Sequence, residues 1–144
     1  MTITFWVPGI PKPGGSKTAF RNKYSGKTAV VDSCKGSKGW KSTVALAAAP
    51  HFRKPLEGAL ELFITFQFLR PQGHFGSGRN SGVLKSSAPK DNTVRPDATK
   101  LTRSTEDALK GIAWRDDVQI VHQEVWKEYG EKAGAQITVK EKKT

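Results

Sequence analysis

Hydrophobic and polar side chains alternate along four stretches of the chain, which predicts β-strands that bury one face. The second stretch is the longest: every even-numbered position from Leu60 to Phe68 is apolar, and apolar residues also occur on its opposite face. It is therefore expected as a central strand covered on both sides. The alternation of the third stretch slips between Ile120 and Val121, which predicts a β-bulge. The four stretches are residues 2–7, 56–69, 118–126 and 135–139.

Two further stretches carry apolar residues at helical spacing. The first begins near Ser37 and ends before Pro50, and Trp40 lies on its apolar face, so Trp40 is expected in the core. The second begins after Asp97, a good N-cap, and ends at Gly111, which tolerates the left-handed conformation that terminates helices. A strand follows directly, so a compact return is expected to bring Asp97 and the pair 116–117 to one end of a layer.

The remaining segments complete the expected architecture. Residues 18–20 and 28–31 are predicted to form a small basic hairpin, and residues 72–93, rich in Gly, Ser, Pro and Asn, a flexible loop that folds over a ligand. Residues 141–144 are expected to be a solvated tail. At 144 residues the chain predicts one domain. The order of elements predicts an α+β fold with a mixed or mainly antiparallel sheet and helices packed on one side.

The net charge of +11 is concentrated in the first part of the chain. Residues 1–55 hold 10 Lys and Arg against one acid, whereas residues 56–144 hold 14 against 12. Such clustering is typical of proteins that bind a phosphate backbone. A membrane-surface helix would also be basic, but these tracts are broken by Gly, Pro and Ser and are not amphipathic. Nucleic acid is the favoured partner.

Basic side chains in loops, on the polar side of the first helix and in the first turn of the second helix are the candidate DNA contacts. Two glycines in the first loop, Gly14 and Gly15, allow backbone N–H groups to approach a phosphate, although the Walker spacing is absent. The candidates are Lys12, Lys17, Arg21, Lys35, Lys38, Lys41, Arg79 and Lys100.

The single cysteine, Cys34, has no partner within the chain, so a disulfide scaffold is excluded and a reducing cytoplasm fits. The sequence shows neither a signal peptide nor an apolar run long enough to span a membrane, which favours a soluble protein.

Acidic residues that reconverge beside basic side chains suit a magnesium site for phosphodiester chemistry, because hard cations choose carboxylate oxygens. The local pattern alone also fits a simple alternative. Asp97 by itself is more often a helix cap, and the pair Asp116 and Asp117 is more often a solvated turn.

The pattern PDxxKLxRxxxDALxGIxWxDDxQ, which covers residues 96–119, resembles the RusA family of Holliday junction resolvases, endodeoxyribonucleases common in bacteriophages and prophages. The family pattern reads approximately P-D-x-D-N-L-x-K, then D-A-L, then D-D-x-Q-V. Asp97 falls on its first acid, Asp117 on the second residue of its acidic pair, and Arg103 on its lysine. One departure is Thr99, which stands where the family has a second acid; Lys100 replaces the family's asparagine.

This resemblance implies a homodimer that cuts four-way or branched DNA in a bacterial cytoplasm, with Mg²⁺ as cofactor and Mn²⁺ as a possible substitute. It implies that Asp97 and Asp117 hold the metal with help from Asp116, and that Arg103 stabilises the transition state. With Thr99 in place of an acid, a higher Mg²⁺ requirement or a preference for Mn²⁺ is expected. Two alternatives remain: a non-catalytic DNA-binding protein, and a metal-dependent nuclease of other branched DNA.

Overall fold

The computed structural model describes residues 1–14 and 39–143 in full, together with the backbone of residues 17–21, 28–32 and 37–38. The described elements are β1 (Thr2–Pro8), β2 (Lys17–Arg21), β3 (Thr28–Asp32), α1 (Ser37–Ala48), β4 (Leu60–Phe68), α2 (Ala98–Leu109), β5 (Ile120–Tyr129) and β6 (Gly134–Glu141), with short 3₁₀ turns between them.

The main sheet has four strands in the order β1-β6-β4-β5. Strand β4 pairs with β6 antiparallel and with β5 parallel, so the sheet is mixed and β4 is central, as predicted. The predicted bulge is confirmed: Leu60 pairs with Ile120 and Glu61 pairs with His122, which leaves Val121 between two registers. Strands β2 and β3 form a separate antiparallel hairpin, also as predicted.

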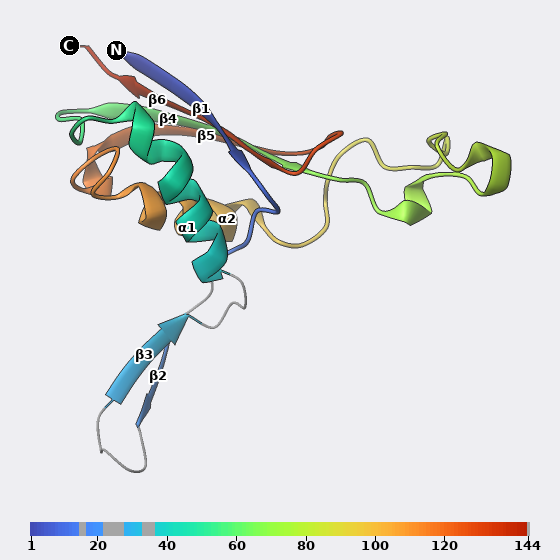
Figure 1. Cartoon of the computed structure of the whole chain (residues 1–144), viewed down its shortest axis with the longest axis horizontal. Coiled ribbons are helices and arrows are strands. Elements are labelled where there is room, and N and C mark those ends of the chain that lie inside the picture. Colours follow the sequence, from blue (N-terminus) through green and yellow to red (C-terminus); the bar gives the residue numbers. More distant parts are fainter. Residues whose placement is uncertain (15–16, 22–27, 33–36, 144) are drawn as a thin grey trace.

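Both helices pack on one face of this sheet, α1 against β1 and α2 against β5, and they contact each other (Figure 1). Trp40 is buried in this layer, and its indole N–H donates to the hydroxyl of Thr105 at 3.1 Å. The prediction that Trp40 belongs to the core is therefore confirmed, and the domain is α+β.

The core lies between the helices and the inner face of the sheet. Even-numbered side chains of β4 from Leu60 to Phe66 are almost completely buried, and those of Ala135, Ile137 and Val139 on β6 complete the layer. The outer face of β4 is only half-buried. The expectation that β4 is covered on both sides is thus wrong, because both helices occupy the same side of the sheet.

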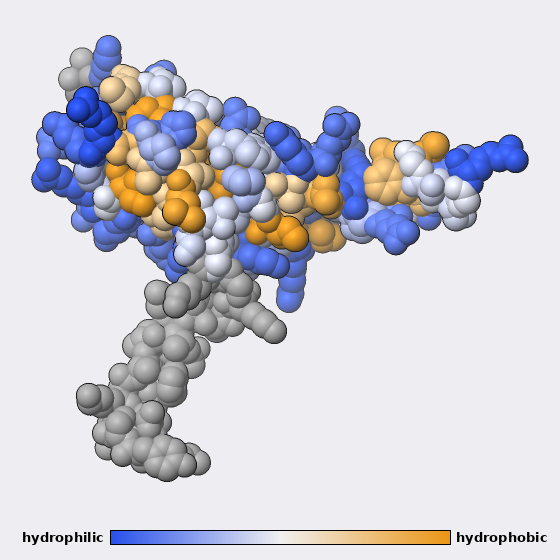
Figure 2. All heavy atoms as spheres, in the orientation of Figure 1, coloured by the Kyte–Doolittle hydropathy of each residue, from blue (hydrophilic) through white to orange (hydrophobic). Residues whose placement is uncertain are grey.

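Residues 70–94 form an arm that projects from the sheet between β4 and α2 (Figure 1). At its base, the Arg70 guanidinium lies 4.7 Å from the centre of the Tyr129 ring, and Arg70 also donates to the carbonyl of Pro89 at 2.6 Å. Within the arm, Phe75 and Leu84 form an isolated bridge. Figure 2 shows hydrophobic side chains along the arm and hydrophilic ones at its tip. The arm's flexibility stays a prediction.

Candidate active site

The N-terminus of α2 carries Asp97 as its cap. The backbone of Asp97 is extended, and its Oδ1 accepts the N–H of Lys100 at 2.8 Å. This confirms the predicted N-cap. Asp97, Lys12 and Lys100 line one groove of about 660 Å³. Two candidate DNA-binding lysines therefore stand beside this acid.

The basic loop after β1 is fixed against the middle of α2. The Gly14 N–H donates to the carbonyl of Lys100 at 2.8 Å, and the Ser104 hydroxyl donates to the carbonyl of Lys12 at 2.6 Å. A Cβ at Gly14 would lie 3.2 Å from the Ser104 nitrogen, so a larger residue at position 14 would require the loop or the helix to shift by a few tenths of an ångström. These contacts hold Lys12 beside the first half of α2.

The second acidic segment is a 3₁₀ turn, Asp117–Gln119, placed between α2 and β5. Asp116 caps this turn, and its side chain accepts the N–H of Val118 at 3.1 Å. Asp117 accepts the indole N–H of Trp114 at 2.7 Å, and Trp114 is completely buried. A buried, packed donor therefore fixes the orientation of the Asp117 carboxylate.

Gln119 ties the acidic turn to the rest of the domain. Its amide nitrogen donates to the carbonyls of Leu56 at 2.9 Å and Gly58 at 3.0 Å. Its amide oxygen accepts the N–H groups of Arg115 at 2.9 Å and Asp116 at 3.0 Å. The turn that carries the acids is thus cross-linked to the segment before β4.

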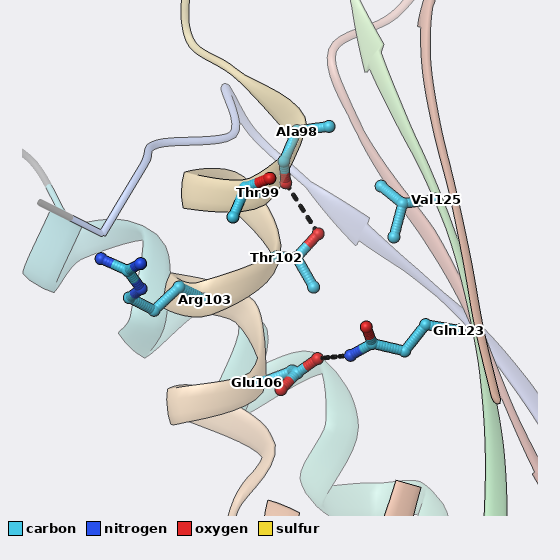
Figure 3. A pocket seen from close by; sticks show the side chains of 7 residues that line it. All are labelled: Ala98, Thr99, Thr102, Arg103, Glu106, Gln123 and Val125. Carbon is cyan, nitrogen blue, oxygen red and sulfur yellow. Dashed lines mark hydrogen bonds between the residues drawn. The ribbon is translucent and has the colours of Figure 1, made fainter. Parts of the chain in front are cut away.

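A pocket of about 350 Å³ opens between α2 and β5. In Figure 3 the side chains of Thr102 and Glu106 point from the helix toward the strand, where the Gln123 amide donates to the Glu106 carboxylate. Arg103 leaves the helix on the side away from Gln123. The lining residues are Ala98, Thr99, Thr102, Arg103, Glu106, Gln123 and Val125.

Glu106 is the one acid of this pocket whose protonation is strongly shifted. The pKa of Glu106 is raised from 4.5 to about 7, chiefly by burial and, to a smaller extent, by the negative charges of Asp117 and Asp107. Glu106 therefore keeps its proton to a higher pH than an exposed glutamate does.

Asp97 and Asp117 stand at opposite ends of α2, which corrects the expectation that they meet within one chain. Strand β5 runs antiparallel to the helix: Lys127 donates to the carbonyl of Pro96, while Gln123 reaches Glu106. The acidic turn precedes β5 and so lies beyond Gln123, at the far end. Nine residues of helix separate Asp97 from Glu106, a rise of roughly 13 Å. The sequence pattern did not reveal this separation, because it gives the order of the helix and the strand. The lengths and directions of these elements decide at which end of α2 each acid lies.

The predicted basic residues have different surroundings. Arg103 and Lys100 line the two cavities described above, and Arg79 is exposed in the arm. Lys41 lies 3.5 Å from the carboxylate of Asp107, which balances part of its charge; its contact with DNA stays a prediction. The side chains of Lys17, Arg21, Lys35 and Lys38 lie outside the residues that the structure describes in full.

Glu106 is a residue of the pocket between α2 and β5 that the sequence pattern did not single out. A signal was present in the helix period, because Thr99 and Glu106 are seven residues apart and so share one face of α2. The family's DAL motif includes the neighbouring Asp107 and not Glu106, and Asp107 forms an ion pair with Lys41.

The acidic turn carries two neighbouring carboxylates, Asp116 and Asp117, and a divalent cation prefers such oxygen ligands. Mg²⁺ is commonly bound through one or two carboxylates and completes its octahedral shell with water and substrate phosphate. Among the fully described residues, no three His, Cys, Asp or Glu side chains form a group that could hold a metal ion. The donor set therefore fits a site that is completed by a bound phosphate.

An α+β domain with an acidic turn, a lysine-lined groove and a strong basic excess has the features of a protein that processes nucleic acid. The comparison with protein families identifies which class it is. The model of the endodeoxyribonuclease RusA family matches residues 8–140. The chain belongs to the RusA family of endodeoxyribonucleases, as the sequence pattern indicated.

A curated relative matches over almost its whole length. It is an uncharacterized protein, YqaN, of Bacillus subtilis (strain 168), which is 30% identical over 144 residues, with 96% of each chain covered. Within the part of the chain that the structure describes, no helix is long and apolar enough to cross a membrane.

Proposed function

We propose that this protein resolves Holliday junctions and related branched DNA by Mg²⁺-dependent hydrolysis of phosphodiester bonds. The observation that carries the proposal is the carboxylate of Asp117, which matches the family's acid and is held in place by the buried Trp114. Family membership and the basic excess of the first 55 residues support branched DNA as the substrate.

The protein's residues contribute binding, orientation and charge. Asp117, with Asp116 beside it, would hold Mg²⁺, which supplies an activated water and neutralises charge on the scissile phosphate. During hydrolysis a water oxygen bonds to phosphorus while the bond from phosphorus to the leaving oxygen breaks. Arg103, at the pocket rim, offers a guanidinium to the negative charge that develops on the phosphate. Lys12 and Lys100 hold the DNA backbone at the groove beside Asp97.

A homodimer is part of this proposal. Resolution of a four-way junction requires paired nicks in two strands, and a two-fold symmetric dimer presents one site to each. A cytoplasmic location in a bacterial host, as for phage or prophage proteins, accords with this substrate.

The test is cleavage of a labelled four-way junction, compared with linear duplex, in Mg²⁺ and in chelator. The junction is expected to be cut only with metal. Asp117→Asn keeps an oxygen to accept from Trp114 but removes the charge, so it should reduce cleavage by about a hundredfold or more. Junction binding should remain, because the basic surface is untouched.

The matched control is Asp91→Asn, since Asp91 is an exposed acid in the arm. It should cut at the wild-type rate. Cleavage by Asp117→Asn at the wild-type rate would contradict the assignment of Asp117 to the active site. Junction binding without cleavage in any divalent metal would instead identify a DNA-binding protein that lacks nuclease activity.

A further inference from the structure

Lys127 on β5 is bonded to the backbone that leads into α2. Its ammonium donates to the carbonyl of Val94 at 2.5 Å and to the carbonyl of Pro96 at 3.0 Å. The side chain is half-buried on the inner face of β5, where Lys127 pairs with the buried Phe66 of β4. A lysine ammonium is strongly hydrated when it is free, so a half-buried one on two carbonyls indicates a specific attachment.

The segment that Lys127 holds has no regular structure of its own. Residues 91–97 form neither helix nor strand. Inside the segment, the Val94 N–H donates to the side chain of the buried Asn92 at 3.3 Å. Among the residues described in full, the hydrogen bonds that join this segment to the main sheet are those of Lys127. Lys127 therefore determines where the chain enters α2.

Asp97 follows Pro96 directly, and the two share a peptide plane. Because a peptide unit is planar from one Cα to the next, a bond to the Pro96 carbonyl oxygen also positions the Cα of Asp97. On its other side, the Asp97 carboxylate accepts the N–H of Lys100 at 2.8 Å. The acid is thus held at its backbone by β5 and at its side chain by the first turn of α2.

We propose that Lys127 is a positioning residue for Asp97. Its ammonium holds the peptide plane from which the Asp97 side chain extends, and so sets where this acid stands in the groove with Lys12 and Lys100. The inference rests on the proposed function, because the position of Asp97 matters to cleavage only if Asp97 is an acid of that active site. Lys127 itself touches neither the DNA nor the metal in this proposal.

A purely structural Lys127 would fasten the segment for stability alone. Lys127→Met retains most of the apolar stem but removes the donors, whereas Lys127→Arg retains both charge and donors. Lys140→Met is the matched control, because Lys140 is an exposed lysine on β6.

The first experiment measures amide hydrogen exchange by NMR in the full-length protein, without metal or DNA. Lys127→Met is expected to speed exchange of the Lys100 amide by about tenfold or more, because the cap made by Asp97 opens more often. The amides of β4 should exchange as in the wild type, since they report global unfolding. A general loss of stability would instead speed exchange of those core amides. Lys140→Met should leave both sets unchanged.

The second experiment measures junction cleavage and junction binding separately. Lys127→Met is expected to lower kcat by about ten- to a hundredfold, the usual loss when a residue that orients a site acid is removed, with junction affinity unchanged. Lys127→Arg should recover part of kcat, and Lys140→Met should cut as the wild type does.

The outcomes separate this inference from the proposed function. Wild-type exchange of the Lys100 amide in Lys127→Met would overturn the inference, whatever the cleavage rate. Faster exchange of that amide with an unchanged kcat would also overturn it, while the nuclease function stands. Faster exchange in Lys127→Met, beside a wild type that never cuts with any metal, would support the placement of Asp97 by Lys127 and overturn the proposed function.

Discussion

At the scale of single residues, two carboxylates are controlled by their surroundings: that of Asp117 by a hydrogen bond, and that of Glu106 by partial burial near other acids. Asp117 is oriented by a hydrogen bond from the buried Trp114. Glu106 is partly desolvated and faces two acids, and these surroundings together raise its pKa to about 7. Burying Glu106 near two other acids lowers the stability of the folded protein, and such perturbed acids are common at functional sites.

The raised pKa of Glu106 predicts a stability difference that depends on pH. In the unfolded chain Glu106 ionises near pH 4.5, whereas in the folded protein it ionises near pH 7. Between these values the folded state binds more protons, so the free energy of unfolding falls as pH rises from 4.5 to 7 and the penalty is complete above 7. Glu106→Gln removes this penalty and should be more stable than wild type at pH 8 in metal-free buffer.

Urea denaturation at pH 8 and at pH 4 checks this expectation. The advantage of Glu106→Gln should shrink toward zero at pH 4, where both states of the wild type hold the proton. An equal stability difference at the two pH values would show that packing, and not the charge of Glu106, is responsible.

At the scale of elements, the acidic turn is a unit built from short-range and long-range hydrogen bonds. Asp116 and Gln119 form a capping box within it, and the Gln119 amide extends to two carbonyls of the segment that leads into β4. A glutamine suits this position because it alone offers both a donor and an acceptor of the required length. The family's glutamine at this position thus has a structural explanation.

Gln119→Glu is expected to destabilise the protein by about 2 kcal/mol or more. The substitution removes the donors to Leu56 and Gly58 and adds a negative charge beside Asp116. Urea denaturation measures the loss, and cleavage assays should show a slower rate because the turn that carries Asp117 is less constrained. Gln136→Glu, at an exposed position of β6, is the control and should change stability by less than about 0.5 kcal/mol. Equal stability of Gln119→Glu and wild type would contradict the role of Gln119.

At the scale of the whole molecule, α2 holds its two family acids apart. Asp97 lies at the groove with Lys12 and Lys100, and Asp117 lies at the other end, in the turn before β5. In the proposed homodimer, a site shared by the two protomers would combine Asp97 of one with Asp117 of the other. Such an arrangement reconciles the family pattern with the length of the helix.

Mixing of two inactive variants tests this arrangement. Asp97→Asn retains the helix cap, since Asn caps as well as Asp, and Asp117→Asn retains its acceptor. Co-refolded Asp97→Asn and Asp117→Asn chains should regain about a quarter of the wild-type sites, because half of the dimers are mixed and each has one intact site. Co-refolding of Asp97→Asn chains with chains that carry both Asp97→Asn and Asp117→Asn should restore no cleavage activity. Absence of recovery in the first mixture would place each site within a single chain.

The sequence by itself determined the elements, because each depends on local periodicity and on caps. The alternation around Leu62 predicted β4, and the interrupted alternation at Val121 predicted the bulge. Asp97 predicted the start of α2. Trp40 was assigned to the core from one helical stripe. The spacing of its acids and Arg103 also indicated the family, which the comparison confirmed.

Only the tertiary structure decided which of these residues meet. The direction of β5 along α2 places Gln123 beside Glu106 and sends Asp97 to the opposite end, and no local pattern contains that direction. The pairing of Lys41 with Asp107 and the attachment of Gln119 to Gly58 join residues about 60 positions apart. Local spacing fixes the face that a side chain occupies, whereas packing of one element on another fixes its neighbours, and those neighbours set its charge state.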